Sequence, residues 1–86
     1  MSGKGADLAA LANRPDAADL HLLGERLRAS APRPMGELEA ALSASLERGG
    51  YDAALAADRK AGALTAIDGW FIPETQALAG LWLASA

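Results

Sequence analysis

Hydrophobic positions recur along the chain at the three-to-four-residue spacing of an α-helix. The clearest stripe has apolar or small residues at i, i+3, i+4, i+7 and i+11, namely Leu20, Leu23, Gly24, Leu27 and Ala31. This spacing predicts one helix from about residue 16 to the prolines at 32 and 34. A glycine inside a helix costs about 1 kcal/mol relative to alanine. We therefore expect a packing reason for Gly24, the close approach of another helix.

Two more helices are predicted on either side of this one. A short helix is expected to begin with Asp7 as its N-cap, to point Leu8 and Leu11 inward, and to end before Pro15. Another is expected over residues 35–48, because glycines 49 and 50 form a clear helix stop. Its inner stripe is predicted to consist of Leu38, Ala41, Leu42, Ser45 and Leu46.

Beyond the double glycine the pattern remains helical. We expect Asp52 to cap a fourth helix, with Tyr51 just outside it and Leu55 and Ala56 facing the core. Gly62 either interrupts or weakens this helix. After Gly62, an i, i+3, i+6, i+7 stripe of helical spacing is formed by Leu64, Ile67, Trp70 and Phe71.

The last helical stripe follows a proline. Pro73 either opens a new helix at its first turn or kinks the preceding one. Leu78, Leu81 and Trp82 form the stripe, which fades at Ser85.

Composition supports a helical fold. Hydrophobic residues make up 51% of the 86 residues and aromatic residues only 5%, and there is no valine. Alanine and leucine, which dominate, are among the best helix formers. The predicted fold is all-α, a small orthogonal bundle of four to five short helices. Residues 1–6 are expected to form a flexible tail and residues 7–86 a single domain.

The cysteine, histidine and charge content of the chain excludes several kinds of site and disfavours several kinds of partner. The chain has no cysteine and one histidine, His21, so disulfides, thiolate zinc sites and multi-histidine metal sites are excluded. A net charge of −3 without a basic cluster disfavours nucleic acid and anionic membranes as partners. No apolar run approaches the roughly 20 residues of a spanning helix, so membrane insertion is not expected.

Candidate catalytic residues are few. The carboxylate pairs Asp16/Asp19 and Glu37/Glu39 both lie in predicted first turns, where the helix dipole accounts for them. We predict no catalytic, cofactor-binding or metal-binding residue. Asp68, close to the apolar stripe, is either a solvated acid or a half-buried acceptor for a partner's arginine or backbone amide.

Aromatic residues suggest a binding surface. Trp70, Phe71 and Trp82 lie within the last seventeen residues, together with Ile72. Tryptophan is enriched at binding hot spots, so we predict that these four residues contact a partner. The alternative is that the rings form the core of the bundle, because aromatic residues dominate cores as well as interfaces.

The order of these segments resembles that of a known family, the small subunits of flavin-dependent sugar and polyol (sorbitol, fructose and glucose) dehydrogenase complexes. The similarity covers most of residues 7–72, and the Trp70-Phe71 pair is its most distinctive feature. The matching segments are residues 8–12 (LAALA), 20–27 (LHLLGERL), 38–46 (LEAALSASL) and 64–71 (LTAIDGWF).

The resemblance implies a non-catalytic accessory subunit that packs against and stabilises a larger enzyme subunit. It implies that FAD and the catalytic residues belong to that partner, an FAD-dependent sugar or alcohol oxidoreductase. The twin-arginine export signal typical of the family is absent from the N-terminal residues. We therefore expect a cytoplasmic location, or a periplasmic one if a partner carries the chain out. The alternative function is a stand-alone helical adaptor or regulatory protein that acts as a homo-oligomer.

Overall fold

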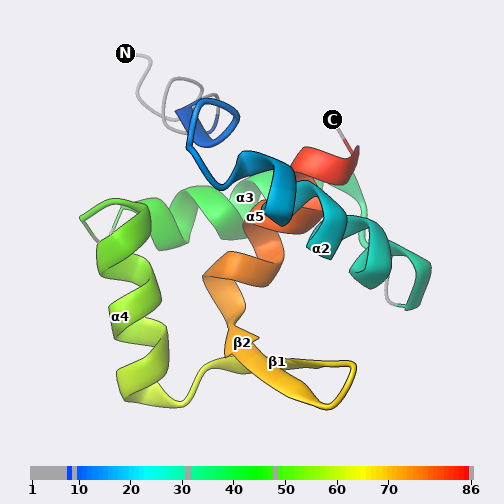
Figure 1. Ribbon diagram of the computed structural model, residues 1–86. Coiled ribbons are helices and arrows are strands. Elements are labelled where there is room, and N and C mark those ends of the chain that lie inside the picture. The colour runs from blue at the N-terminus through cyan, green and yellow to red at the C-terminus, as the bar shows by residue number, and fades with distance from the viewer. Residues whose placement is uncertain (1–7, 9, 31, 48, 86) are drawn as a thin grey trace.

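Helices and one β-hairpin make up the computed structural model, which describes residues 8, 10–30, 32–47 and 49–85 (Figure 1). Leu8, Ala10 and Leu11 are helical and precede a turn. The elements that follow are α2 (Ala17–Ser30), α3 (Met35–Leu46), α4 (Tyr51–Ala61), β1 (Leu64–Ile67), β2 (Trp70–Pro73) and α5 (Glu74–Ser85).

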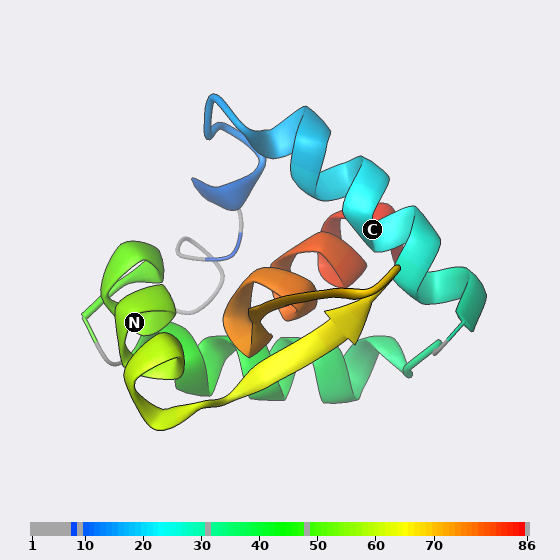
Figure 2. The ribbon, with the colours of Figure 1, turned by 60° about the horizontal axis from the view of Figure 1, so that its bottom comes forward.

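Helix α5 lies at the centre of the molecule, between α2 and α3, and the hairpin leads into its first turn (Figure 2). It carries almost no charged side chain, and six of its residues are buried: Thr75, Ala77, Leu78, Ala79, Gly80 and Leu81. A helix that is apolar on every side has to be covered by its neighbours. The leucines of the other helices provide this cover and form one continuous core with α5.

Helices α2 and α5 cross at two glycines. A Cβ atom added to Gly24 would lie 1.8 Å from the carbonyl oxygen of Gly80, and one added to Gly80 would lie 2.7 Å from the carbonyl oxygen of Leu20. The two backbones are therefore in direct contact, which only glycine permits. The close helix approach predicted for Gly24 is confirmed.

The leucine stripes predicted for the first three helices are also confirmed. Leu8 and Leu11 are buried, as are Leu20 and Leu27 of α2. In α3, four residues of the predicted stripe are buried, Leu38, Leu42, Ser45 and Leu46, and Ala41 packs against the core. Asp7, Ala31 and Arg48, which the sequence places at helix ends or on a stripe, lie outside the described residues, as does the predicted tail.

The helix predicted over residues 64–71 is wrong, and with it the purely all-α fold. This segment is an antiparallel hairpin in which Thr65 pairs with Ile72 and Ile67 with Trp70. Gly62 ends α4 in the left-handed conformation, with φ 74°. Asp68 and Gly69 both have positive φ, 50° and 83°. Positive φ at both central residues belongs to the two-residue type I′ turn, which reverses the chain and is incompatible with a helix.

The predicted start of the fourth helix is displaced by two positions. Helix α4 begins at Tyr51, with Gly50 as its N-cap residue, so Asp52 lies in the first turn instead of at the cap. A carboxylate is still favoured there by the helix dipole. Pro73 ends β2 and immediately precedes α5, which agrees with the predicted opening of a new helix.

A buried carboxylate joins α4 to α5. Asp58, 2% exposed, accepts a hydrogen bond from the backbone N–H of Thr75 at 2.7 Å. The first N–H groups of a helix have no partner within the helix, so an acceptor from α4 satisfies one of them. This contact fixes the direction in which α5 leaves the hairpin.

Candidate functional site

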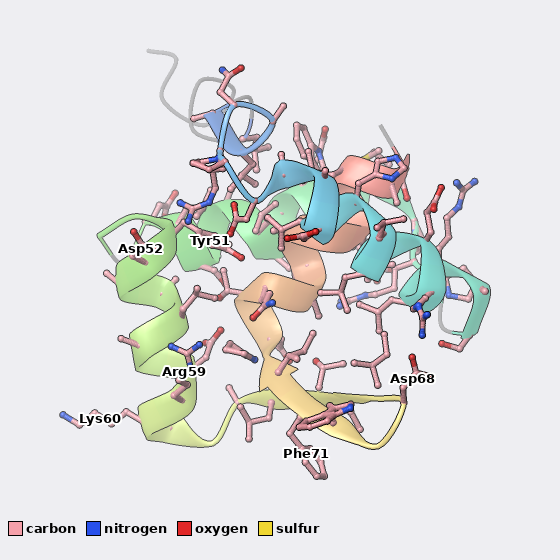
Figure 3. All side chains as sticks on the ribbon, in the orientation of Figure 1. Tyr51, Asp52, Arg59, Lys60, Asp68 and Phe71 are labelled. Atoms are coloured by element: carbon pink, nitrogen blue, oxygen red, sulfur yellow. The ribbon has the colours of Figure 1, made fainter. Side chains whose placement is uncertain are left out.

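The hairpin carries the most exposed large hydrophobic side chains among the described residues. Trp70 is 75% exposed and Phe71 is 71% exposed, although they are neighbours on β2. Phe71 points away from the body of the molecule (Figure 3). Two aromatic side chains side by side in water are unusual, because each would bury 150–250 Å² in a core or an interface.

Strand pairing extends this apolar surface onto β1. Ala66 is the cross-strand partner of Phe71, so both side chains lie on the same face of the hairpin. Leu64, two residues before Ala66, shares that face and is 43% exposed. Trp70, whose cross-strand partner is Ile67, lies on the other face at the turn end of the hairpin and is exposed there. We refer to Leu64, Ala66, Trp70 and Phe71 together as the aromatic hairpin surface, which covers one face of the hairpin and the turn end of the other.

The opposite face of the hairpin attaches it to the core. Ile67 and Ile72 are partly buried and pack against the core cluster. At the turn, Asp68 pairs with Arg26 of α2, with Nη1 and Oδ2 separated by 2.5 Å. The Asp68 side chain is 58% exposed, so this carboxylate is a solvated acid with a partner inside the chain. The pair connects the hairpin tip to α2.

The four predicted partner-contacting residues do not form one surface. Trp70 and Phe71 are exposed neighbours on β2, whereas Ile72 is partly buried against the core. Trp82 is partly buried near the end of α5, where its Nε1 donates to Glu39 of α3 at 3.4 Å. Eight helical positions separate Trp82 from the start of α5, a distance of about 12 Å along the axis. The exposed aromatic pair on the hairpin is therefore separate from Ile72 and Trp82.

A second cluster surrounds Tyr51 at the start of α4. The Arg14 guanidinium lies 4.4 Å from the centre of the Tyr51 ring and bonds to Asp16 at 2.9 Å and to Asp52 at 3.5 Å (Figure 3). The Asp16 hydrogen bond raises the pKa of Arg14, and burial raises the pKa of Tyr51 to about 12. A hollow of about 340 Å³ adjoins the two side chains.

This second cluster is a weak candidate for chemistry. Among the described residues that line the hollow, the one cation is Arg14, which is already shared by two carboxylates. With a pKa near 12, the Tyr51 hydroxyl keeps its proton at neutral pH and is a poor base. The arrangement is that of a structural ion network between the turn at residues 12–16 and α4.

The single histidine lies apart from both clusters. His21 of α2 is 47% exposed, with Nδ1 3.8 Å from a carboxylate oxygen of Glu25 one turn later. Within the described residues, no three histidine, aspartate or glutamate side chains gather in a way that could hold a metal ion. No helix there is long and apolar enough to cross a membrane.

Sequence reasoning missed the role of β1 in the site. The pair Asp68-Gly69 is the signal that was available, because Asp-Gly between two apolar runs is a strong indication of a hairpin. Reading it that way would have placed Leu64 and Ala66 on one face with Phe71.

Comparison with protein-family models, with curated proteins and with solved structures gave no significant match.

Proposed function

We propose that this chain is a non-catalytic accessory subunit, which packs its aromatic hairpin surface against a larger enzyme subunit and stabilises it. The observation that carries the proposal is the exposure of Trp70 and Phe71, at 75% and 71%, on a hairpin that packs against the core through Ile67 and Ile72. Exposed aromatic anchors on a rigid support are typical of binding hot spots.

The size of the surface favours a larger partner over a second copy of the chain. Trp70 and Phe71 together offer roughly 300 Å² of exposed side chain, whereas a stable interface buries about 800 Å² on each partner. A concave site on a larger protein can enclose two projecting rings and also contact the flanking elements. Two convex hairpins placed tip to tip would bury much less.

The proposed partner is an FAD-dependent sugar or alcohol oxidoreductase. The support for this class is the similarity of segments 8–12, 20–27, 38–46 and 64–71 to the small subunits of such complexes. FAD and the reacting residues would then belong to the larger subunit, and this chain would contribute contact surface alone.

Co-expression tests the proposal directly. The full chain is produced together with a candidate FAD-dependent sugar or alcohol oxidoreductase, and the mixture is analysed by size-exclusion chromatography with light scattering. We expect a 1:1 complex and at least tenfold weaker assembly for the double variant Trp70→Thr/Phe71→Thr. Leu22→Gln is the matched control, because Leu22 is 60% exposed on α2, outside the aromatic hairpin surface.

Two results would count against this function. One is a complex whose affinity the double variant leaves unchanged, which would place the interface elsewhere. The other is a stable homodimer of the chain alone that ignores the oxidoreductase, which would favour the homo-oligomeric adaptor instead.

A further inference from the structure

The outer edge of β1 has unpaired backbone groups. Glu74 N–H donates to the carbonyl of Ala63 at 2.9 Å, which makes this the first hydrogen-bonded pair of the hairpin. Hydrogen-bonded and non-hydrogen-bonded pairs alternate along an antiparallel ladder, so Leu64 and Ala66 occupy non-hydrogen-bonded positions. Their N–H and C=O groups point away from β2. No hydrogen bond from another described segment reaches them.

An apolar hollow adjoins β1 on the face that carries Thr65. It has a volume of about 150 Å³ and lies between β1, which contributes Thr65, and the helices α2 and α5. Its apolar walls are formed by Leu27, Ala77, Leu78 and Leu81. An apolar cavity of roughly 150 Å³ accommodates a benzene molecule, so this one has room for a single aliphatic or phenyl side chain.

The position of the hollow matches the free edge of β1. Arg33, in the segment that leads into α3, lines the hollow together with Thr65. In Figure 2 that segment lies on the β1 side of the hairpin, beyond the outer strand. A chain paired with β1 would therefore run past the hollow, and one of its inward side chains would meet it.

The charged residues around the hollow favour an uncharged side chain in the segment that binds there. Arg33 and Glu74 both line it and have opposite signs, so neither an acidic nor a basic side chain gains a net attraction. The walls are apolar, and an ion placed among them would lose its hydration without a dedicated partner.

From this geometry we infer that β1 accepts an extended segment of the partner protein as a third strand, which places one aliphatic or phenylalanine side chain in the hollow. Main-chain pairing with Leu64 and Ala66 supplies affinity, and the hollow supplies side-chain selectivity, as in other cases of strand addition. The inference rests on the proposed function and specifies how the partner is recognised. Strand addition also supplies contact area that the two aromatic rings lack.

The test uses random ten-residue peptides displayed on phage and selected on the immobilised full chain, so it does not depend on the oxidoreductase. We expect selected peptides to share one aliphatic or phenylalanine position. Hydrogen exchange of the unmodified chain should show slowed exchange at the Leu64 and Ala66 amides when a synthetic copy of such a peptide is added. The exchange rates of amides in the middle of α4 should not change.

Two variants test the edge and the hollow. Ala66→Pro removes an outward N–H and leaves the pairing with β2 intact, so peptide affinity should fall at least tenfold. Ala77→Leu fills the hollow from α5 and should weaken the same peptides. The matched control is Leu22→Gln on α2, which keeps both edge and hollow and should bind the peptides normally, because Leu22 is exposed away from the hairpin.

Several results would overturn the inference. They are a selection that yields no binding peptide, peptides that protect amides other than Leu64 and Ala66, and peptides that bind the Ala66→Pro chain equally well. Protection of these amides in a dimer of the chain without any peptide would show that a second copy occupies the edge. A normal complex with the oxidoreductase alongside any of these results would leave the proposed function standing.

Discussion

Two glycines set the distance between the longest described helix, α2, and the central helix α5. At Gly24 and Gly80 the backbones touch, and any side chain would occupy the space of a carbonyl oxygen. The energetic cost of glycine inside a helix is accepted here because the close crossing lets Leu20 and Leu27 reach the core beside α5. Gly36, which has nothing within 4 Å of its missing Cβ, has no such role.

This difference gives a matched pair of substitutions. Gly24→Ala should lower the free energy of unfolding by about 3 kcal/mol or more, because its Cβ would lie 1.8 Å from a backbone oxygen that has to move. Gly36→Ala should raise it by up to about 1 kcal/mol, since alanine favours the helix. Urea denaturation monitored by circular dichroism measures both. Equal effects at the two positions would contradict the observed crossing.

Tyr51 gives the protein an alkaline limit to its stability. Burial raises the pKa of Tyr51 to about 12, from an ordinary value of 10, so the folded chain binds the phenolic proton more tightly than the unfolded chain. The resulting stability is complete below pH 10 and is lost as pH rises from 10 to 12, by about 1–3 kcal/mol. The ultraviolet absorbance of tyrosinate reports the titration directly, because Tyr51 is the only tyrosine.

Tyr51→Phe provides the control for this pH dependence. The free energy of unfolding of this variant should fall less steeply between pH 10 and 12, because only lysine and arginine side chains then contribute to its pH dependence. A tyrosine that titrates near pH 10 in the folded chain would show that Tyr51 is open to water.

At the scale of elements, α4 and α5 depend on one carboxylate. Asp58→Ala should lower the free energy of unfolding by about 1–3 kcal/mol, because it leaves the Thr75 N–H at the buried start of α5 without its acceptor. Asp52→Ala in the same helix is the control. The Asp52 side chain is 84% exposed, and its loss should cost less than about 1 kcal/mol. Thermal unfolding of the two variants measures both losses of stability. A smaller loss for Asp58→Ala than for Asp52→Ala would argue against a stabilising role of the Asp58 hydrogen bond at the start of α5.

Helices whose buried residues recur at a single spacing could be predicted from the hydrophobic pattern, and the hairpin could not. The stripes of α2 and α3 face a single core, so leucine spacing identifies both helices and their buried faces. In the hairpin the strand alternation is obscured, because Trp70 and Phe71 are adjacent and both exposed. Leu64, Ile67, Trp70 and Phe71 then fit a helical spacing by coincidence. Only the left-handed turn at Asp68-Gly69 distinguishes the two structures, and it acts through backbone φ instead of hydrophobicity.

For the whole molecule, the aromatic residues divide into two groups that sequence alone could not separate. Tyr51 and Trp82 pack in or against the core, whereas Trp70 and Phe71 do not. A chain of 86 residues buries about 60–65% of the surface exposed on unfolding, so leaving two large rings in water forgoes a substantial part of the available stabilisation. That cost is explained if a partner covers them.

This division predicts opposite stability effects for surface and core substitutions. Trp70→Thr/Phe71→Thr should change the free energy of unfolding of the isolated chain by less than about 1 kcal/mol, because threonine keeps the strand propensity and little buried area is lost. Leu78→Ala should cost about 2–5 kcal/mol, since Leu78 is only 2% exposed. Urea denaturation of both variants measures this contrast. A loss of several kcal/mol in the double variant would mean that the rings belong to the core, and the case for a partner-binding hairpin would fail with it.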